Sequence, residues 1–233
     1  MKAILRSGFL VLAMMLALAV PASAGLYEDG VKAAERGDYT TALNFWRPLA
    51  EQGDAKLQFT IGLIYYKGHS VPQDYAEAEK WFRLAAEQGV AEAQFKLGLM
   101  YDAGQNLPQD YAEAAKWYRM AAEQGHATAQ FNLGVFYAIG EGVPQDAAEA
   151  VIWYLKAAEQ GYTKALNNLG VLYAIGEGVP QDNVSASMWF NLAAALGHKK
   201  AQDGQEIVTE RMTPAQIAEA QRMAREWMAK HHQ

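Results

Sequence analysis

Histidines, acids and aromatic residues are the side chains of this 233-residue chain whose types could do chemistry. The spacings His-Glu-x-x-His and Gly-x-Ser-x-Gly do not occur, and the chain has no cysteine, which excludes thiol nucleophiles, thiolate metal sites and disulfides. The histidines are His69, His126, His198, His231 and His232. Only the last two are close in sequence, and adjacent residues of a helix point apart. We therefore predict no catalytic residue, no metal site and no cofactor, and a protein that is not an enzyme.

The stretch GEGVPQD, at 140–146 and 176–182, could be mistaken for a phosphate-binding loop. An aspartate, Asp146 or Asp182, stands at the start of the following helix, where it would repel a phosphate from the free amides. We interpret the stretch as a turn between two helices. The other acids are explained by helix caps and exposed helix faces.

Tryptophans recur at a fixed interval, with Trp81, Trp117, Trp153 and Trp189 each 36 residues apart. The residue directly after each tryptophan is a phenylalanine or tyrosine, namely Phe82, Tyr118, Tyr154 and Phe190. Aromatic side chains each bury roughly 150–250 Å², so strict recurrence predicts core packing, and Trp117→Ala should then cost about 3–5 kcal/mol. Stacking on a sugar is the alternative.

The same interval organises the rest of the chain. Rows of 36 residues at 50–85, 86–121, 122–157 and 158–193 align without a gap, and each contains Pro-Gln-Asp. The aspartate is a good N-cap for a helix. A glutamate three residues later completes a capping box in three rows, and a glycine ends the helix as a left-handed residue. These residues are Asp74, Asp110, Asp146 and Asp182; Glu77, Glu113 and Glu149; and Gly89, Gly125, Gly161 and Gly197.

The helix before each Pro-Gln-Asp contains a glycine, as at Gly62 and Gly134. Such a glycine costs about 1 kcal/mol against alanine, so its recurrence indicates close helix contact, and we expect the tryptophan to fill the space opposite. Helix pairs of this size cannot bury their faces alone and must stack. We predict an all-α fold, a right-handed superhelical solenoid of stacked antiparallel helix pairs.

The segments outside the four rows complete the predicted organisation. Residues 25–50 form an atypical first helix pair, with Trp46 near the slot of Trp81 and Pro48 ending its second helix. Residues 51–197 hold the four repeats, and residues 198–233 form capping helices. The last of these begins at Thr213 with Pro214 in its first turn and Gln216 completing a capping box, and its apolar stripe is Ile217, Ala220, Ala224 and Trp227.

Residues 1–24 have the pattern of a secretory signal peptide. Lys2 and Arg6 precede an apolar run at 9–20, and Ala22-Ser23-Ala24 supplies a cleavage site. We expect cleavage after Ala24, no stable membrane anchor afterwards, and a periplasmic location in a bacterium, with release from the cell as the alternative. The formal net charge is −6, and becomes −8 without these residues, which carry two positive charges and no acid. That charge gives no electrostatic case for nucleic acid or anionic lipid, and favours a neutral or basic partner.

Positions that vary between rows on the first helix of each pair are free to specify a partner. Residues four apart share one helix face. We predict that this face lines a groove for an extended peptide, in which amides bond the backbone and apolar residues hold side chains. The candidate residues form a first row of Lys56, Glu92, Thr128 and Lys164, a second row of Thr60, Lys96, Asn132 and Asn168, and an apolar row of Ile64, Met100, Phe136 and Leu172.

The recurring unit resembles the Sel1-like repeat, a relative of the tetratricopeptide repeat. One copy carries it as Ala129, Leu133, Gly134, Tyr137, Gly140, Gly142, Asp146, Ala150, Trp153, Tyr154, Ala157, Ala158 and Gly161. The resemblance covers about residues 26–205 and implies an all-helical scaffold for protein interaction, without naming the partner or the oligomeric state.

A protein-binding scaffold of the bacterial cell envelope is therefore the function that the sequence favours. Two alternatives stay open: an enzyme, or a regulator of one, acting on cell wall or peptides, and a structural protein that self-assembles through its terminal repeats. A nucleophile–base pair would favour the enzyme, and the sequence shows none.

Overall fold

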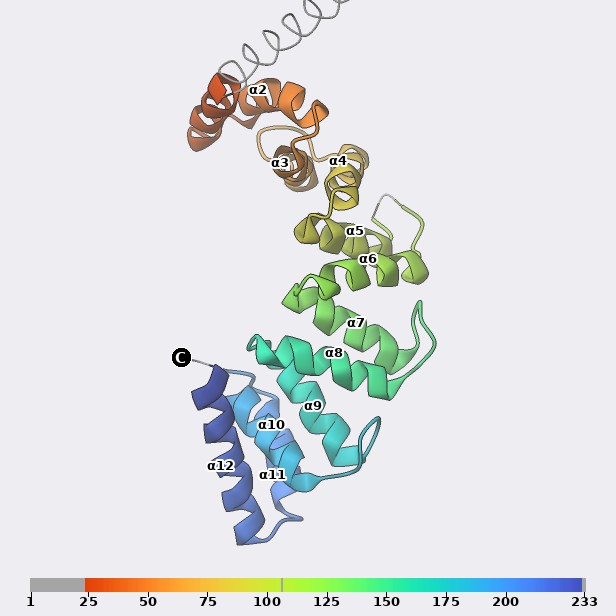
Figure 1. The fold of residues 1–233 in the computed structure, drawn as a ribbon, viewed down its shortest axis with the longest axis vertical. Coiled ribbons are helices and arrows are strands. Elements are labelled where there is room, and N and C mark those ends of the chain that lie inside the picture. The colour runs from red at the N-terminus through yellow and green to blue at the C-terminus, as the bar shows by residue number, and fades with distance from the viewer. Residues whose placement is uncertain (1–23, 106, 232–233) are drawn as a thin grey trace, which may run out of the picture. The chain divides into compact units, whose positions relative to one another are not determined.

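The fold is described from a computed structural model of the chain, for residues 24–105 and 107–231 (Figure 1). Within these ranges every regular element is a helix, which confirms the all-α prediction. The expected signal peptide lies, apart from Ala24, outside the described residues. Of the residues described, no helix is both long and apolar enough to span a bilayer.

The chain divides into two compact units, and the division falls after Ala93, inside helix α5 (Ala91–Ala103). The first unit begins with a helical segment at 24–35. Three helices follow it, α2 (Tyr39–Glu51), α3 (Ala55–Lys67) and α4 (Tyr75–Glu87). Helix α3 packs against both α2 and α4, so the unit is built from successive antiparallel helices.

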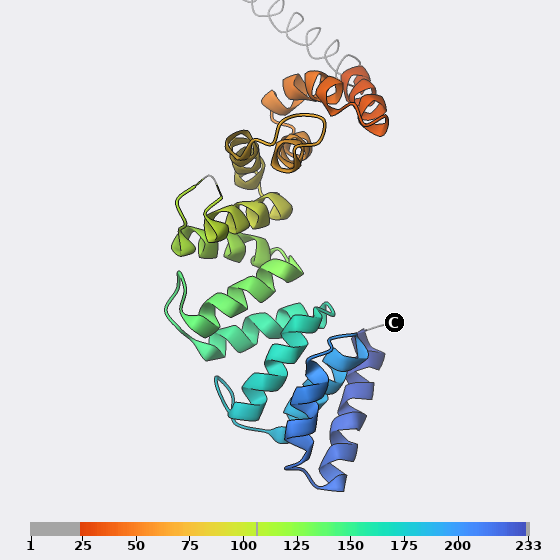
Figure 2. The same cartoon turned by 180° about the vertical axis from the view of Figure 1, so that it is seen from behind.

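The second unit continues the same arrangement. Its helices after α5 are α6 (Tyr111–Glu123), α7 (Ala127–Ile139), α8 (Ala147–Glu159), α9 (Thr163–Ile175), α10 (Asn183–Ala195), α11 (Ala201–Thr209) and α12 (Pro214–His231). From α6 to α11 each helix packs against the next, and α12 packs along α10. In both views the longer loops, α7–α8 and α9–α10, lie at the same edge of this unit (Figures 1 and 2). Stacked helix pairs of this kind are the predicted solenoid.

Each Pro-Gln-Asp aspartate caps the helix that follows it, as predicted. Asp146 Oδ1 accepts from the backbone N–H groups of Ala148 and Glu149 at 2.9 and 3.0 Å, and Asp74, Asp110 and Asp182 act alike. The prediction of a capping box is wrong at Asp146, whose own N–H donates to the carbonyl of Tyr137 at 2.8 Å. The glutamate is therefore not needed there. The box predicted at the start of α12 is confirmed, because Gln216 Oε1 accepts from the Thr213 N–H at 2.9 Å and the Thr213 hydroxyl accepts in return at 3.3 Å.

The glutamine of Pro-Gln-Asp closes the loop that it ends, a role not expected from the sequence. Gln145 Nε2 donates to the carbonyl of Ala138 at 2.9 Å, and Gln181 Nε2 donates to that of Ala174 at 2.8 Å. Gln73 and Gln109 make the same bond in their own loops. The recurring tripeptide therefore clamps the loop and starts the helix.

The glycine in the first helix of each pair makes room for an aromatic ring. A Cβ built on Gly134 would lie 2.7 Å from ring atoms of Tyr154. The pairs Gly62–Phe82, Gly98–Tyr118 and Gly170–Phe190 repeat this relationship. The expectation that the tryptophan fills this space is wrong, since the ring belongs to the next residue. A residue's neighbour on a helix is rotated by about 100°, which turns the tryptophan toward another helix.

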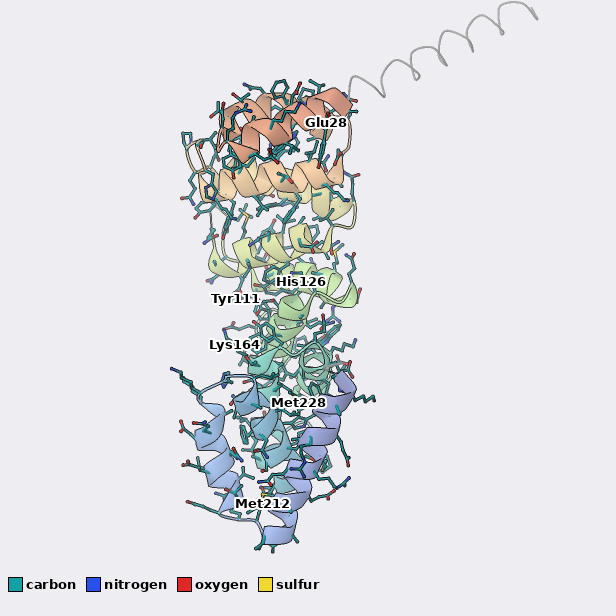
Figure 3. All side chains as sticks on the ribbon, turned by 90° about the vertical axis from the view of Figure 1, so that its left-hand side faces the viewer. Glu28, Tyr111, His126, Lys164, Met212 and Met228 are labelled. Carbon is teal, nitrogen blue, oxygen red and sulfur yellow. The ribbon has the colours of Figure 1, made fainter. Side chains whose placement is uncertain are left out.

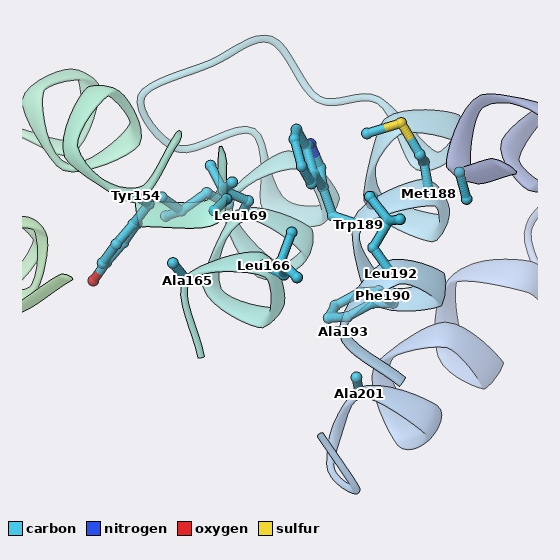
Figure 4. Packing of buried hydrophobic residues seen from close by; sticks show 14 of the residues in the cluster. Tyr154, Ala165, Leu166, Leu169, Met188, Trp189, Phe190, Leu192, Ala193 and Ala201 are labelled. Atoms are coloured by element: carbon cyan, nitrogen blue, oxygen red, sulfur yellow. The ribbon is translucent and has the colours of Figure 1, made fainter. Parts of the chain in front are cut away.

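The tryptophans instead join successive pairs. Trp153 on α8 is only 5% exposed and lies in one cluster with Leu133 of α7 and Ala114 of α6. Trp81 and Trp189 are also buried, and Figure 4 shows Trp189 beside Leu166 and Leu169 of α9. Trp117 is half-buried. The stacking of tryptophans on a sugar, the alternative considered above, is therefore not supported.

Glutamine pairs, each with one buried member, form a second link between helix pairs, which sequence reasoning missed. Gln160 Nε2 donates to Gln130 Oε1 at 2.8 Å, and Gln130 Nε2 donates to the carbonyl of Ala122 at 3.0 Å. The pairs Gln88–Gln58 and Gln124–Gln94 repeat the side-chain bond. At the next junction both members are replaced, by Leu166 and Leu196, which belong to one apolar cluster. Both glutamines of the pair are thus replaced together at this junction, so that an apolar contact takes the place of the hydrogen bond.

Two expectations about the first helix pair are corrected. Trp46 does not occupy the slot of Trp81, because its ring covers Gly30 just as Phe82 covers Gly62. Pro48 does not end its helix, since α2 continues to Glu51. The buried side chains of Leu49 and Ala50 anchor the last turn, and this packing outweighs the hydrogen bond that proline cannot donate.

Candidate binding groove

The predicted apolar row lies in the core and does not line an open surface. Ile64, Met100, Phe136 and Leu172 are all at most 8% exposed. Eight residues advance a helix by two turns and about 80°, so this row is rotated away from the first row, and Phe136 packs against Tyr111 and Tyr118 of the preceding helix α6. The expectation that all three rows share one exposed face is therefore corrected.

The other two rows lie nearer to solvent. In the first row Lys56, Glu92 and Lys164 are exposed and Thr128 is half-buried, and Lys164 lies at the start of α9 (Figure 3). In the second row Thr60, Lys96, Asn132 and Asn168 are half-buried. The Thr60 hydroxyl donates to the carbonyl of Lys56 within its own helix at 2.8 Å, which leaves it less available for a partner.

Asn132 and Asn168 are held by buried tyrosines. The Tyr118 hydroxyl donates to Asp102 Oδ2 at 2.8 Å, and its oxygen accepts from the side-chain amide of Asn132. Asn168 hydrogen-bonds the hydroxyl of Tyr154. Burial raises the pKa of both tyrosines, so the hydroxyls stay neutral near neutral pH. The repeated asparagine is thus explained first by an internal hydrogen bond, and each amide is fixed in position by it.

The second unit contains an open apolar pocket between α7 and α9, which we call the α7–α9 groove. It has a volume of about 280 Å³. One wall consists of Val135, Ala138 and Ile139 of α7, and the other of Asn168, Val171 and Leu172 of α9. Tyr154 of α8 also lines the pocket. Ile139 is 54% exposed and Val171 42% exposed. Large apolar side chains so exposed, around a concave surface, are typical of a surface that binds another protein.

The groove includes only two of the residues predicted from the sequence, Asn168 and Leu172. Sequence reasoning missed its most exposed members, Ile139 and Val171. A signal for them exists in the alignment of the rows, because Ile139 and Ile175 stand where earlier rows have Lys67 and Ala103. Large apolar residues at an otherwise solvated position distinguish the third and fourth repeats from the first two.

The chemistry of the α7–α9 groove suits recognition. Its walls can take an apolar side chain, while the half-buried amide of Asn168 offers polar atoms to an adjoining peptide backbone. A few fixed polar groups in an apolar pocket are characteristic of binding sites. Within the part of the chain that the structure describes, histidine, aspartate and glutamate side chains nowhere gather in threes around a common point.

A second pocket, of about 340 Å³, lies between α10 and the last helix α12. Its apolar lining includes two core residues, Leu192 of α10 and Ala224 of α12, together with Ala195 and Met228. Because two repeat helices with exposed apolar side chains form the α7–α9 groove, that groove is the stronger candidate for a partner.

Comparison with known proteins agrees with this architecture. The family described as "Sel1 repeat" matches residues 13–54, 55–90, 91–126, 127–162 and 163–198. A crystal structure of a protective antigen from uropathogenic Escherichia coli strains, displaying an SLR fold, is 32% identical with a TM-score of 0.76, over 92% of this chain and 48% of that one. This chain thus spans about half the length of that protein. A Sel1 repeat protein from Oxalobacter formigenes is 32% identical with a TM-score of 0.73, over 89% of this chain and 86% of that one. A search of curated proteins gave no match.

Proposed function

The chain belongs to the Sel1 repeat family, and on that premise we propose that it is a non-catalytic scaffold that binds a peptide segment of another protein in the α7–α9 groove. Sel1 repeat proteins generally mediate protein–protein interaction and typically act as non-enzymatic scaffolds. The proposal adds a site and a mode of binding to that general role.

One observation carries the proposal. Ile139 and Val171 remain about half exposed on the two walls of one apolar pocket, whereas other exposed apolar side chains of the repeats, such as Ile152, do not line it. Burying apolar surface stabilises a complex by roughly 25 cal/mol per Å². A partner that inserts one apolar side chain between these two residues would remove both from water.

The experiment is a selection of binding peptides from a display library of random twelve-residue sequences, followed by affinity measurements on single variants. Val171→Asp places a charge on the wall of the groove and should weaken binding at least about tenfold, or about 1.4 kcal/mol. Ile152→Asp is the matched control, because Ile152 is 45% exposed on α8 and does not line the groove. Equal loss in both variants, or in neither, would show that peptides bind elsewhere.

We also propose that the protein acts in the bacterial cell envelope, in the periplasm. Support comes from residues 1–24, where Lys2 and Arg6 precede an apolar run and an Ala-x-Ala site. Fractionation of cells that express the full chain tests this. The mature form should begin at Gly25 and appear in the periplasmic fraction, whereas an uncleaved chain in the cytosol would contradict it.

A further inference from the structure

We propose that the occupant of the α7–α9 groove is a basic peptide segment, in which lysine or arginine residues stand next to the apolar residue that enters the pocket. This inference rests on the proposed function and adds to it the charge of the partner. It depends on the chemistry of the loops that border one end of the groove.

Two free carboxylates stand at that end. Ile139 and Ile175 are the last residues of α7 and α9, and Glu141 and Glu177 follow them by two positions. The loops that carry these glutamates lie at one edge of the unit in both views (Figures 1 and 2). Among the described residues neither glutamate takes part in an ion pair. Both carboxylates are thus available to a partner.

Basic residues are missing from the surrounding sequence. No lysine or arginine occurs at 120–155 or at 165–198, which include all of α7, the loops with both glutamates, and α9 from its third residue on. Arg119 on α6 approaches α7, but its guanidinium donates to the Tyr137 hydroxyl and lies 5.5 Å from the centre of that ring. Lys164 stands at the opposite end of α9. The end of the groove beside Ile139 is therefore acidic.

The C-terminal ends of α7 and α9 add to the negative charge at this end of the groove. The C-terminal end of a helix carries roughly half a negative charge, and α7 and α9 both end beside the two glutamates, at Gly140 and Gly176. A cation placed there is attracted by the carboxylates and by both helix ends. An acidic segment would be repelled by all of them. Charge complementarity therefore selects a peptide that has bases next to its apolar anchor, with the bases directed toward Glu141 and Glu177.

The test uses the full chain and two synthetic peptides that share the apolar anchor selected above. In one peptide two lysines stand on each side of the anchor, and in the other two glutamates do. We expect the lysine peptide to bind roughly tenfold more tightly, because its lysines form exposed ion pairs with the two glutamates of the protein. Glu141→Lys combined with Glu177→Lys should abolish or reverse this preference. Glu123→Lys combined with Glu159→Lys makes the same change in net charge at the ends of α6 and α8 and should preserve it.

The outcomes separate the inference from the proposed function. If both peptides bind equally and Val171→Asp still weakens them, the groove binds peptides but the basic partner is refuted. If the two double variants lose the preference alike, the effect is only net charge, and the inference also fails. If Val171→Asp changes nothing for either peptide, the proposed function fails with it. The preference should also shrink as salt is raised from 50 to 500 mM, because exposed charges are screened.

Discussion

The ring of Tyr154 on α8 lies against the backbone of Gly134 on α7, so closely that a Cβ at this glycine would approach ring atoms to 2.7 Å. The same tyrosine reaches the α7–α9 groove and hydrogen-bonds Asn168 through its hydroxyl. One contact thus sets the spacing of the helix pair and fixes a polar atom of the candidate site. The architecture and the proposed binding surface depend on the same residue.

Gly134→Ala should therefore destabilise the protein, although alanine favours helix formation by about 1 kcal/mol elsewhere. Overpacking a core commonly costs about 1–3 kcal/mol, and urea unfolding measures the difference. On a background of Tyr154→Ala the ring is gone, and Gly134→Ala should become neutral or stabilising. A loss of equal size on both backgrounds would mean that the ring is not the obstacle.

The pair of buried Gln130 and exposed Gln160 gives a second prediction. Gln160→Leu leaves the side-chain oxygen of Gln130, Oε1, without its hydrogen-bond donor. The loss should cost about 1–3 kcal/mol. Gln130→Leu together with Gln160→Leu copies the apolar pair of Leu166 and Leu196 and should recover most of that loss. Chemical denaturation compares the variants. If the double variant loses as much unfolding free energy as the two single variants together, the two leucines do not compensate for each other, and this prediction is wrong.

The tryptophans should differ in their contribution to stability. Trp153 is buried between α6, α7 and its own helix, so Trp153→Ala should cost about 3–5 kcal/mol. Trp117 is half-buried, so Trp117→Ala should cost less than the sequence alone suggested. Thermal melts of both variants rank them. A larger loss at Trp117 would contradict the packing described for α6 and α8.

Stability should fall in alkaline solution because of the buried tyrosines. The pKa values of Tyr118 and Tyr154 are raised in the folded protein, so their contribution is complete below the ordinary tyrosine pKa of about 10 and is lost as the pH rises above it. Unfolding free energies measured from pH 8 to 11 should decline. Tyr118→Phe with Tyr154→Phe should flatten the decline, and phenylalanine already occupies the matching positions 82 and 190. If the unfolding free energy of this double variant declines with pH as steeply as that of the unmodified protein, other groups cause the decline.

The fold could be predicted from the sequence because its signals are local and repeated. Asp146 as a cap and Gly161 as a helix end depend on residues next to them in the chain. The partner of Gly134 could not be predicted in the same way, because the choice between Trp153 and Tyr154 depends on how two helices are rotated against each other. The site was predicted least well. Periodicity placed Leu172 on the open face, whereas packing against the neighbouring helix buries it and exposes Val171.

The central claim is that the α7–α9 groove is the surface that binds a partner peptide. Methyl NMR of the full chain, titrated with the lysine peptide, tests it most directly, because exposed isoleucine and valine methyl groups lie both inside and outside the groove. The account predicts shifts at Ile139 and Val171, with Ile152 and Ile207 unchanged. Shifts confined to Ile152 or Ile207, with Ile139 and Val171 unaffected, would contradict it.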